Sequence, residues 1–236
     1  MPKEPDPVRD LVPMPAATGA QPSVEEAPVQ PPSHRRTTVV YGIDYGSRRA
    51  GTTVIARWTP ELPERKVDFG ISERKADADL YVQTHFLRDR PQHVFLDAPL
   101  SLPGIYTGLP DHHDYFYRRC DRELGAMSPM FLGGLTARAM RLAAFFRKHD
   151  CAVHEVYPGA LARDWKLKDL NYKEQKGYLP DVITALRERL KDLPFTAKDL
   201  RTWHHVDALL ALVSGVRFLR AESLIVGHPA EGVIVV

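Results

Sequence analysis

The pattern of hydrophobic positions predicts a β-rich opening that begins near residue 37. The β-branched run over 37–43 indicates a buried strand, and residues 51–58 and 66–71 predict two more strands. Their short links favour an antiparallel meander, because strands joined by a few residues pair with each other. A helix over 76–88 and a short fourth strand over 93–96 are expected next.

Helical and strand patterns alternate in the second half of the chain. Apolar residues at helical spacing predict helices over 135–148, 172–191 and 202–219, and residues 152–157 predict a strand between the first two. Such alternation is typical of parallel crossover units, so the sheet is expected to be mixed. The C-terminal run 232–236 predicts a late strand.

The segment 1–36 has a different character. It contains nine of the 20 prolines and no periodic apolar pattern. Because such a segment buries too little surface to offset its ordering entropy, we expect a disordered tail followed by one domain over 37–236. Pro-rich stretches also favour extended conformations that binding modules recognise, which leaves a protein partner for the tail open.

Composition narrows the class of protein without deciding its partner. The chain has 236 residues, 44% hydrophobic and 26% charged, which suits one globular core, and its net charge of +2 neither requires nor excludes nucleic acid. Cys120 and Cys151 lack metal-binding spacing, which argues against a zinc site. No apolar run approaches a bilayer span and the start lacks a secretory pattern, so we expect a cytoplasmic protein with no membrane partner.

Two aspartates follow predicted strands. Asp44 ends the first strand and Asp97 the fourth, and each precedes a turn that contains Gly or Pro. If the strands are parallel neighbours, both carboxylates emerge at one edge of the sheet, where hard oxygen ligands suit Mg²⁺ or Mn²⁺. An isolated Asp in this position is more often a helix cap or turn former, but its recurrence at two strand ends favours a metal site.

A third carboxylate lies inside an apolar helix. Asp207 is surrounded in sequence by Val, Ala and Leu, and an unpaired buried carboxylate is costly, so it needs a partner. His204 stands three residues earlier on the same helical face, either as a ligand or proton carrier near the site or as an ordinary residue of the first turn.

Cationic residues supply candidates for substrate contact. Arg119 and Arg122 flank Asp121 in a predicted short helix and could clamp a phosphate, although a surface salt-bridge cluster explains them equally well. Lys168 and Lys173 belong to a basic segment interleaved with aromatic residues, a candidate nucleic-acid contact that a solvated helix face explains nearly as well.

Five motifs in order resemble one known family. It is domain-of-unknown-function family 429, described as predicted nucleases with an RNase H-like (RuvC-like) fold, and the resemblance covers about residues 38–236. The motifs are Gly42-Ile43-Asp44-Tyr45-Gly46, Phe95-Leu96-Asp97-Ala98-Pro99-Leu100-Ser101, Arg119-Cys120-Asp121-Arg122, Glu155-Val156-Tyr157-Pro158 and Asp207-Ala208-Leu209.

The resemblance implies a fold and an activity. The fold is α/β, with a mixed five-stranded sheet of three antiparallel meander strands and two parallel crossover strands, flanked by helices. The activity is hydrolysis of phosphodiester bonds in DNA or RNA with two Mg²⁺ or Mn²⁺ ions, and the catalytic acids are Asp44, Asp97 and Asp207. His204 stands where related resolvases carry an acid, and Glu155 could compensate for that difference.

Two other classes stay open at this stage. A protein of this fold could be a non-catalytic module that binds nucleic acid or protein. The segment 42–47 also resembles the first phosphate loop of actin-like ATPases, but those proteins close a cleft between two such domains, and roughly 200 residues leave room for one.

Overall fold

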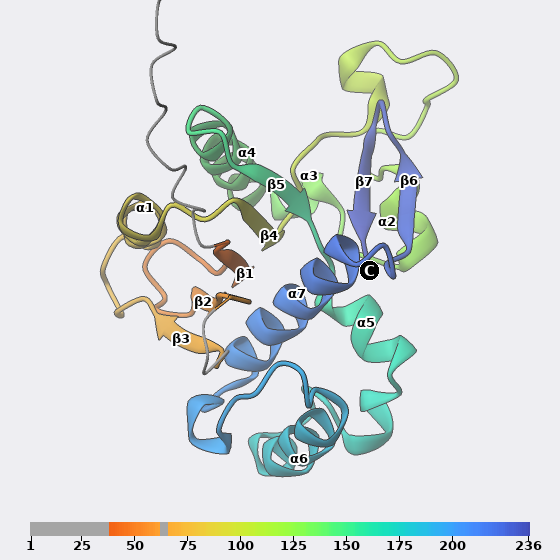
Figure 1. Ribbon diagram of the computed structural model, residues 1–236. Helices are drawn as coiled ribbons and strands as arrows, with labels where there is room; N and C mark the ends of the chain where they lie inside the picture. Colours follow the sequence, from red (N-terminus) through yellow and green to blue (C-terminus); the bar gives the residue numbers. More distant parts are fainter. Residues whose placement is uncertain (1–37, 62–65) are drawn as a thin grey trace, which may run out of the picture. The chain divides into compact units, whose positions relative to one another are not determined.

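Five strands form one mixed sheet in the computed structural model, which describes residues 38–61 and 66–236. The expected tail over 1–36 lies outside the described residues. The strand order is β3-β2-β1-β4-β5, with β1 to β3 antiparallel and β4 and β5 parallel to β1 (Figure 1). The mixed α/β sheet predicted from the sequence is therefore confirmed. The strands are β1 (Val40–Asp44), β2 (Val54–Trp58), β3 (Asp68–Ile71), β4 (His93–Asp97) and β5 (Ala152–Glu155).

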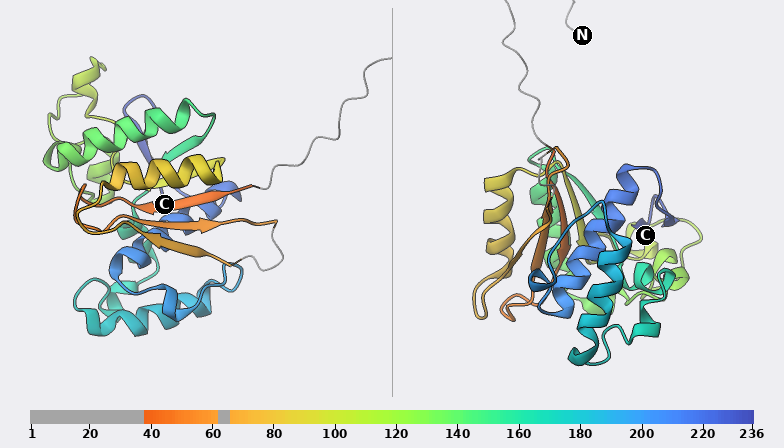
Figure 2. Two further views of the ribbon diagram at one scale, coloured as in Figure 1. Left: turned by 90° about the vertical axis from the view of Figure 1, so that its left-hand side faces the viewer. Right: turned by 60° about the horizontal axis from the view of Figure 1, so that its bottom comes forward.

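Helices cover both faces of the sheet, and the alternation along β1 explains why. Val40 packs in a core cluster with residues of α5, α6 and α7, whereas Tyr41 and Ile43 point into a second cluster with residues of α1 and α4. Figure 2 shows α1 and α4 on one side of the sheet and α7 on the other. The helices are α1 (Ala78–Asp89), α4 (Gly134–Arg147), α5 (Pro158–Asp164), α6 (Leu179–Arg189) and α7 (Trp203–Leu219).

The crossing of α7 over β1 requires glycine at position 42. A Cβ atom on Gly42 would lie 2.2 Å from the backbone nitrogen of Leu212 and 2.5 Å from the carbonyl oxygen of Ala208. Only glycine allows backbones to approach so closely. The crossing also brings the first turn of α7, with His204, to the carboxyl end of β1, where Asp44 lies.

Smaller elements connect this framework. The late strand predicted over 232–236 is confirmed as β7, but its antiparallel partner β6 was not predicted. The hairpin of β6 and β7 packs on α2. These elements are η1 (Gly104–Thr107), α2 (Arg119–Leu124), α3 (Pro129–Leu132), η2 (Leu167–Leu170), η3 (Lys176–Tyr178), η4 (Ala197–Asp199), β6 (Ile225–His228) and β7 (Gly232–Val235).

The helix predicted over 172–191 was wrong in its first third, because α6 begins only at Leu179. Lys173 has a φ of 66°, in the left-handed region, which breaks a helix there. Pro180 has no N–H to donate and fits only a first turn, so the helix has to begin just before it. Lys173 therefore lies outside α6, and its side chain pairs with Asp207 of α7.

The described helices were also compared with the requirements of a membrane span. None of those within 38–61 and 66–236 is both long enough and apolar enough to cross a bilayer. The most hydrophobic of the long helices, α7, packs against β1, β2 and β4 of the sheet. Its apolar surface is therefore explained by the core.

Candidate active site

Two carboxylates lie side by side at the end of the sheet. β1 and β4 are parallel, and Asp44 pairs in register with Asp97. Neighbouring strands are about 4.8 Å apart, so both side chains leave the same edge, as predicted. Both residues line a pocket of about 190 Å³, and Asp44 is 8% exposed. The sheet thus delivers a carboxylate pair to one small, partly enclosed space.

Asp207 has the partner that its burial demands. Asp207 is 2% exposed, the Tyr172 hydroxyl donates a hydrogen bond to Oδ1, and the Lys173 Nζ lies 2.6 Å from Oδ2. Burial raises the pKa of Asp207 to about 6, although Lys173 opposes the rise. Lys173 was expected at a nucleic-acid surface, and the structure places it on this acid. Tyr172 had not been singled out for this role.

Asp97 is the least compensated of the three acids. Burial, and then the charges of Asp44 and Asp207, raise the pKa of Asp97 well above its usual range. Within the described residues no donor makes a hydrogen bond to its carboxylate. Repulsion among three nearby carboxylates is relieved by a cation, and the charges of Asp207, Asp97 and Asp44 all act to raise the pKa of Lys173.

His204 contacts the pair of carboxylates through a hydrogen bond with Asp44. Its Nδ1 lies 2.7 Å from the Oδ2 atom of Asp44 and donates a hydrogen bond to it when it carries the proton. This hydrogen bond raises the pKa of His204, while partial burial opposes the rise. The His204 side chain is 43% exposed, so solvent reaches the ring. The residue is therefore brought to the site, where it can exchange protons with water.

The donor set fits a divalent cation at Asp44 and Asp97. No group of three His, Cys, Asp or Glu side chains in the described part of the chain is arranged to hold a metal ion. Mg²⁺ does not require such a group, because it keeps several waters and is commonly bound by one or two carboxylates together with substrate phosphates. Two in-register carboxylates, one of them without a hydrogen-bond donor, match that requirement.

Glu155 lines the same pocket but is held by a buried arginine. The Arg118 side chain is fully buried, and its guanidinium lies 2.6 Å from Glu155 Oε1 and 2.7 Å from Oε2. The same guanidinium lies 2.6 Å from Asp121 Oδ1, and the backbone N–H of Leu100 also donates to Glu155. Glu155 therefore has little capacity left for a metal. Sequence reasoning missed Arg118, whose one local signal is its spacing of three from Asp121.

The two arginines chosen from the sequence lie elsewhere. Arg119 and Arg122 are exposed on α2 and pair with Glu123 and Asp114, at 2.6 and 2.7 Å. They line a separate hollow of about 300 Å³ and not the pocket of Asp44 and Asp97. Lys168 is exposed on η2 and also lies outside that pocket. Of the four predicted substrate contacts, only Lys173 reaches the acids.

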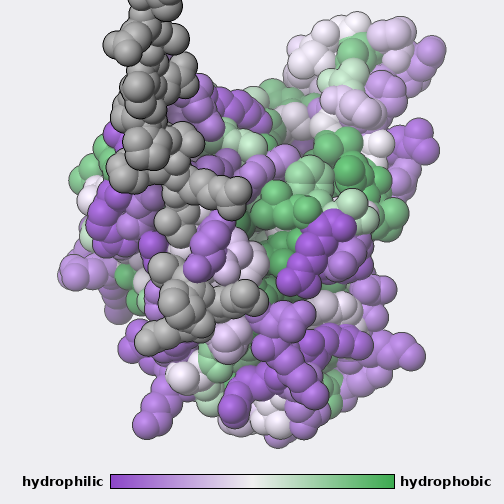
Figure 3. Space-filling view, viewed as in Figure 1, coloured by the Kyte–Doolittle hydropathy of each residue, from purple (hydrophilic) through white to green (hydrophobic). Residues whose placement is uncertain are grey.

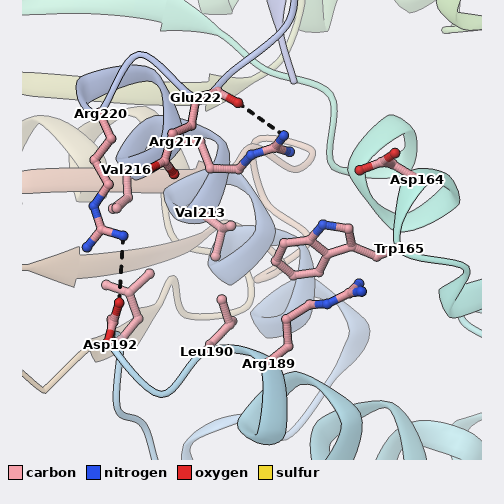
Figure 4. Close-up of a pocket in the computed structure, with 11 residues that line it drawn as sticks. Asp164, Trp165, Arg189, Leu190, Asp192, Val213, Val216, Arg217, Arg220 and Glu222 are labelled. Carbon is pink, nitrogen blue, oxygen red and sulfur yellow. Dashed lines mark hydrogen bonds and ion pairs between the residues drawn. The ribbon is translucent and has the colours of Figure 1, made fainter.

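A larger hollow of about 400 Å³ lies between α6 and the C-terminal half of α7 (Figure 4). The arginines that line it interact with other residues of the hollow. The Arg189 guanidinium lies 4.7 Å from the centre of the Trp165 ring, and the Arg220 guanidinium lies 3.8 Å from the Asp192 carboxylate. Arg217 donates a hydrogen bond to the backbone carbonyl of Glu222. None of the three acids lines this hollow, so it is separate from the carboxylate site.

Comparison of the chain with family models, curated proteins and solved structures found no match. The family suggested by the sequence motifs therefore stays a prediction. Function is therefore inferred from the geometry of the carboxylates and their partners.

Proposed function

We propose that the protein is a metal-dependent nuclease of RNase H-like fold that hydrolyses phosphodiester bonds in nucleic acid. The observation that carries the proposal is the in-register pair Asp44 and Asp97, with Asp207 close enough to raise the pKa of Asp97. The strand order β3-β2-β1-β4-β5, with acids on the first strand, the fourth strand and the last long helix, is the order expected for that fold and supports it.

Asp44 and Asp97 would hold the divalent cation. When bound, Mg²⁺ or Mn²⁺ supplies charge stabilisation at the phosphate and lowers the pKa of a coordinated water. Both oxygens of Asp207 are engaged, one by Tyr172 and the other by Lys173. A second ion at Asp207 would therefore have to displace Lys173. One ion at Asp44 and Asp97 is therefore the arrangement that the geometry supports best.

Two side chains of this chain supply the remaining chemistry. His204, oriented by Asp44, is placed to accept a proton from water or return one to the leaving oxygen. Lys173, oriented by Asp207, presents an ammonium group whose charge suits a phosphate oxygen. Tyr172 fixes the other oxygen of Asp207 and so keeps this pair in place.

A non-catalytic binding module is the second candidate, and one observation favours it. Lys173 already compensates Asp207, and its charge also acts on Asp97 and Asp44. In such a module, the lysine would replace a metal ion permanently. The actin-like alternative lacks comparable support, since the turn amide of Gly46 donates to Thr53 at 3.0 Å and is not free for a phosphate.

The two candidates are separated by a cleavage assay. Labelled single-stranded, duplex and branched DNA and RNA are incubated with the full chain in Mg²⁺ or Mn²⁺. We expect cutting that disappears in EDTA and in Asp44→Asn and persists in Asp68→Asn, which changes an exposed aspartate on β3. Absence of cutting across the panel, with nucleic acid still bound, would favour the binding module.

A further inference from the structure

The pocket beside the carboxylates has both charged and apolar lining residues. Asp44 and Asp97 are among the charged ones, and Met127, Leu132 and Leu135, from the segment around α3 and the start of α4, are among the apolar ones. Its volume of about 190 Å³ has room for several water molecules, and a single planar heterocycle is of that order of size. The size and the mixed lining therefore suit one nucleobase.

Exposed hydrophobic side chains continue from the mouth of this pocket. Met127, which lines it, is 61% exposed, and Phe131, next to the lining residue Leu132, is 64% exposed. The Phe131 ring lies 5.5 Å from Phe116 and 5.8 Å from Tyr117, centre to centre. Figure 3 shows hydrophobic residues gathered over α3 and the β6–β7 hairpin. Contiguous exposed rings of this kind mark a contact surface, and nucleobases stack on them.

We propose that this pocket receives one unpaired nucleobase of a single-stranded nucleic acid, and that Met127 and Phe131 form the stacking surface at its mouth. The inference rests on the proposed function, because a phosphate near Asp44 and Asp97 places the base of the same nucleotide within reach of the pocket. A base in a duplex is stacked and paired, and has to leave the helix before it can enter such a pocket. The preferred substrate is therefore single-stranded.

Binding is measured by fluorescence anisotropy with labelled oligonucleotides and the full chain in EDTA, so that no cleavage is needed. We expect single strands to bind more tightly than the matching duplex. Phe131→Ala should weaken binding about tenfold, within the range of base stacking on an aromatic side chain, and Met127→Ala should weaken it less. Leu80→Ala, at an equally exposed position on α1, should leave it unchanged.

The outcomes separate this inference from the proposed function. Equal affinity for single strand and duplex, or unchanged affinity in both Phe131→Ala and Met127→Ala, would overturn the base pocket even if the protein cuts nucleic acid. In a different outcome, the protein binds single strands selectively, loses affinity in both variants and cuts nothing. That result would support the base pocket and contradict the proposed nuclease activity. Because both residues are more than 60% exposed, neither variant depends on repacking of the core.

Discussion

Replacing Arg118 by Met tests the buried ionic cluster next to the carboxylate site. The Arg118 guanidinium is fully buried and donates to Asp121, Glu155 and the Ser101 hydroxyl. Removing one partner of a buried ion pair costs roughly 3–5 kcal/mol, because the remaining charge is left without compensation. Here one cation serves two carboxylates, so we expect a loss of about 5 kcal/mol, a large fraction of the roughly 5–15 kcal/mol that stabilises a typical domain.

The free energy of unfolding is measured by urea titration, followed by tryptophan fluorescence. Arg119→Met is the matched control, because the neighbouring Arg119 is 66% exposed and its pair with Glu123 should contribute less than about 1 kcal/mol. Adding Glu155→Gln and Asp121→Asn to Arg118→Met should recover much of the loss, since the stranded charges are then removed.

Two results would contradict a dependence of Glu155 and Asp121 on Arg118. A loss below about 1 kcal/mol in Arg118→Met would mean that the two carboxylates do not depend on this cation. Full rescue by Arg118→Lys would show that a point charge suffices, whereas the geometry requires a planar group that reaches both Glu155 and Asp121.

Three further predictions concern pH, charge and packing. Burial lowers the pKa of His205 to about 4, so the folded state favours the neutral ring. The free energy of unfolding should therefore fall by about 3 kcal/mol between pH 6.5 and 4. Urea titrations across that range should show a shallower fall for His205→Gln than for the unaltered protein. Lys173→Met should raise Mn²⁺ affinity, since a competing cation is removed, and lower the cleavage rate, which calorimetry and single-turnover assays measure separately. Gly42→Ala should lower the melting temperature or prevent folding, because its Cβ meets the α7 backbone, whereas Gly177→Ala, which meets open space, should not.

The sheet and its carboxylate pair could be predicted because their signals are local. β-branched runs indicate strands. When two neighbouring parallel strands each end in an Asp and pair in register, as β1 and β4 do, the two carboxylates reach the same edge of the sheet. The start of α6 also had a local signal, since Pro180 fits only a first turn. The helix predicted over 172–191 began too early because apolar spacing alone does not mark a first turn, which Pro180 does.

The partners of the buried charges could not be predicted in the same way. Lys173 and Asp207 are 34 positions apart in the sequence, and Arg118 and Glu155 are 37 apart. Such pairs form only after α7 and β5 are packed, so a single sequence shows that a buried carboxylate needs a partner without saying which cation supplies it. The exposed Arg119 and Arg122 looked equally suitable in sequence, and only burial distinguishes Arg118 from them.

Asp44 and Asp97 together are proposed to hold the divalent cation. Mn²⁺ binding to the full chain, measured by electron paramagnetic resonance, tests this proposal most directly, with Asp97→Asn as the variant and Asp68→Asn as the control. We expect one bound ion in the unaltered protein and in Asp68→Asn, and loss of that ion in Asp97→Asn. Unchanged Mn²⁺ binding by Asp97→Asn would contradict the proposal.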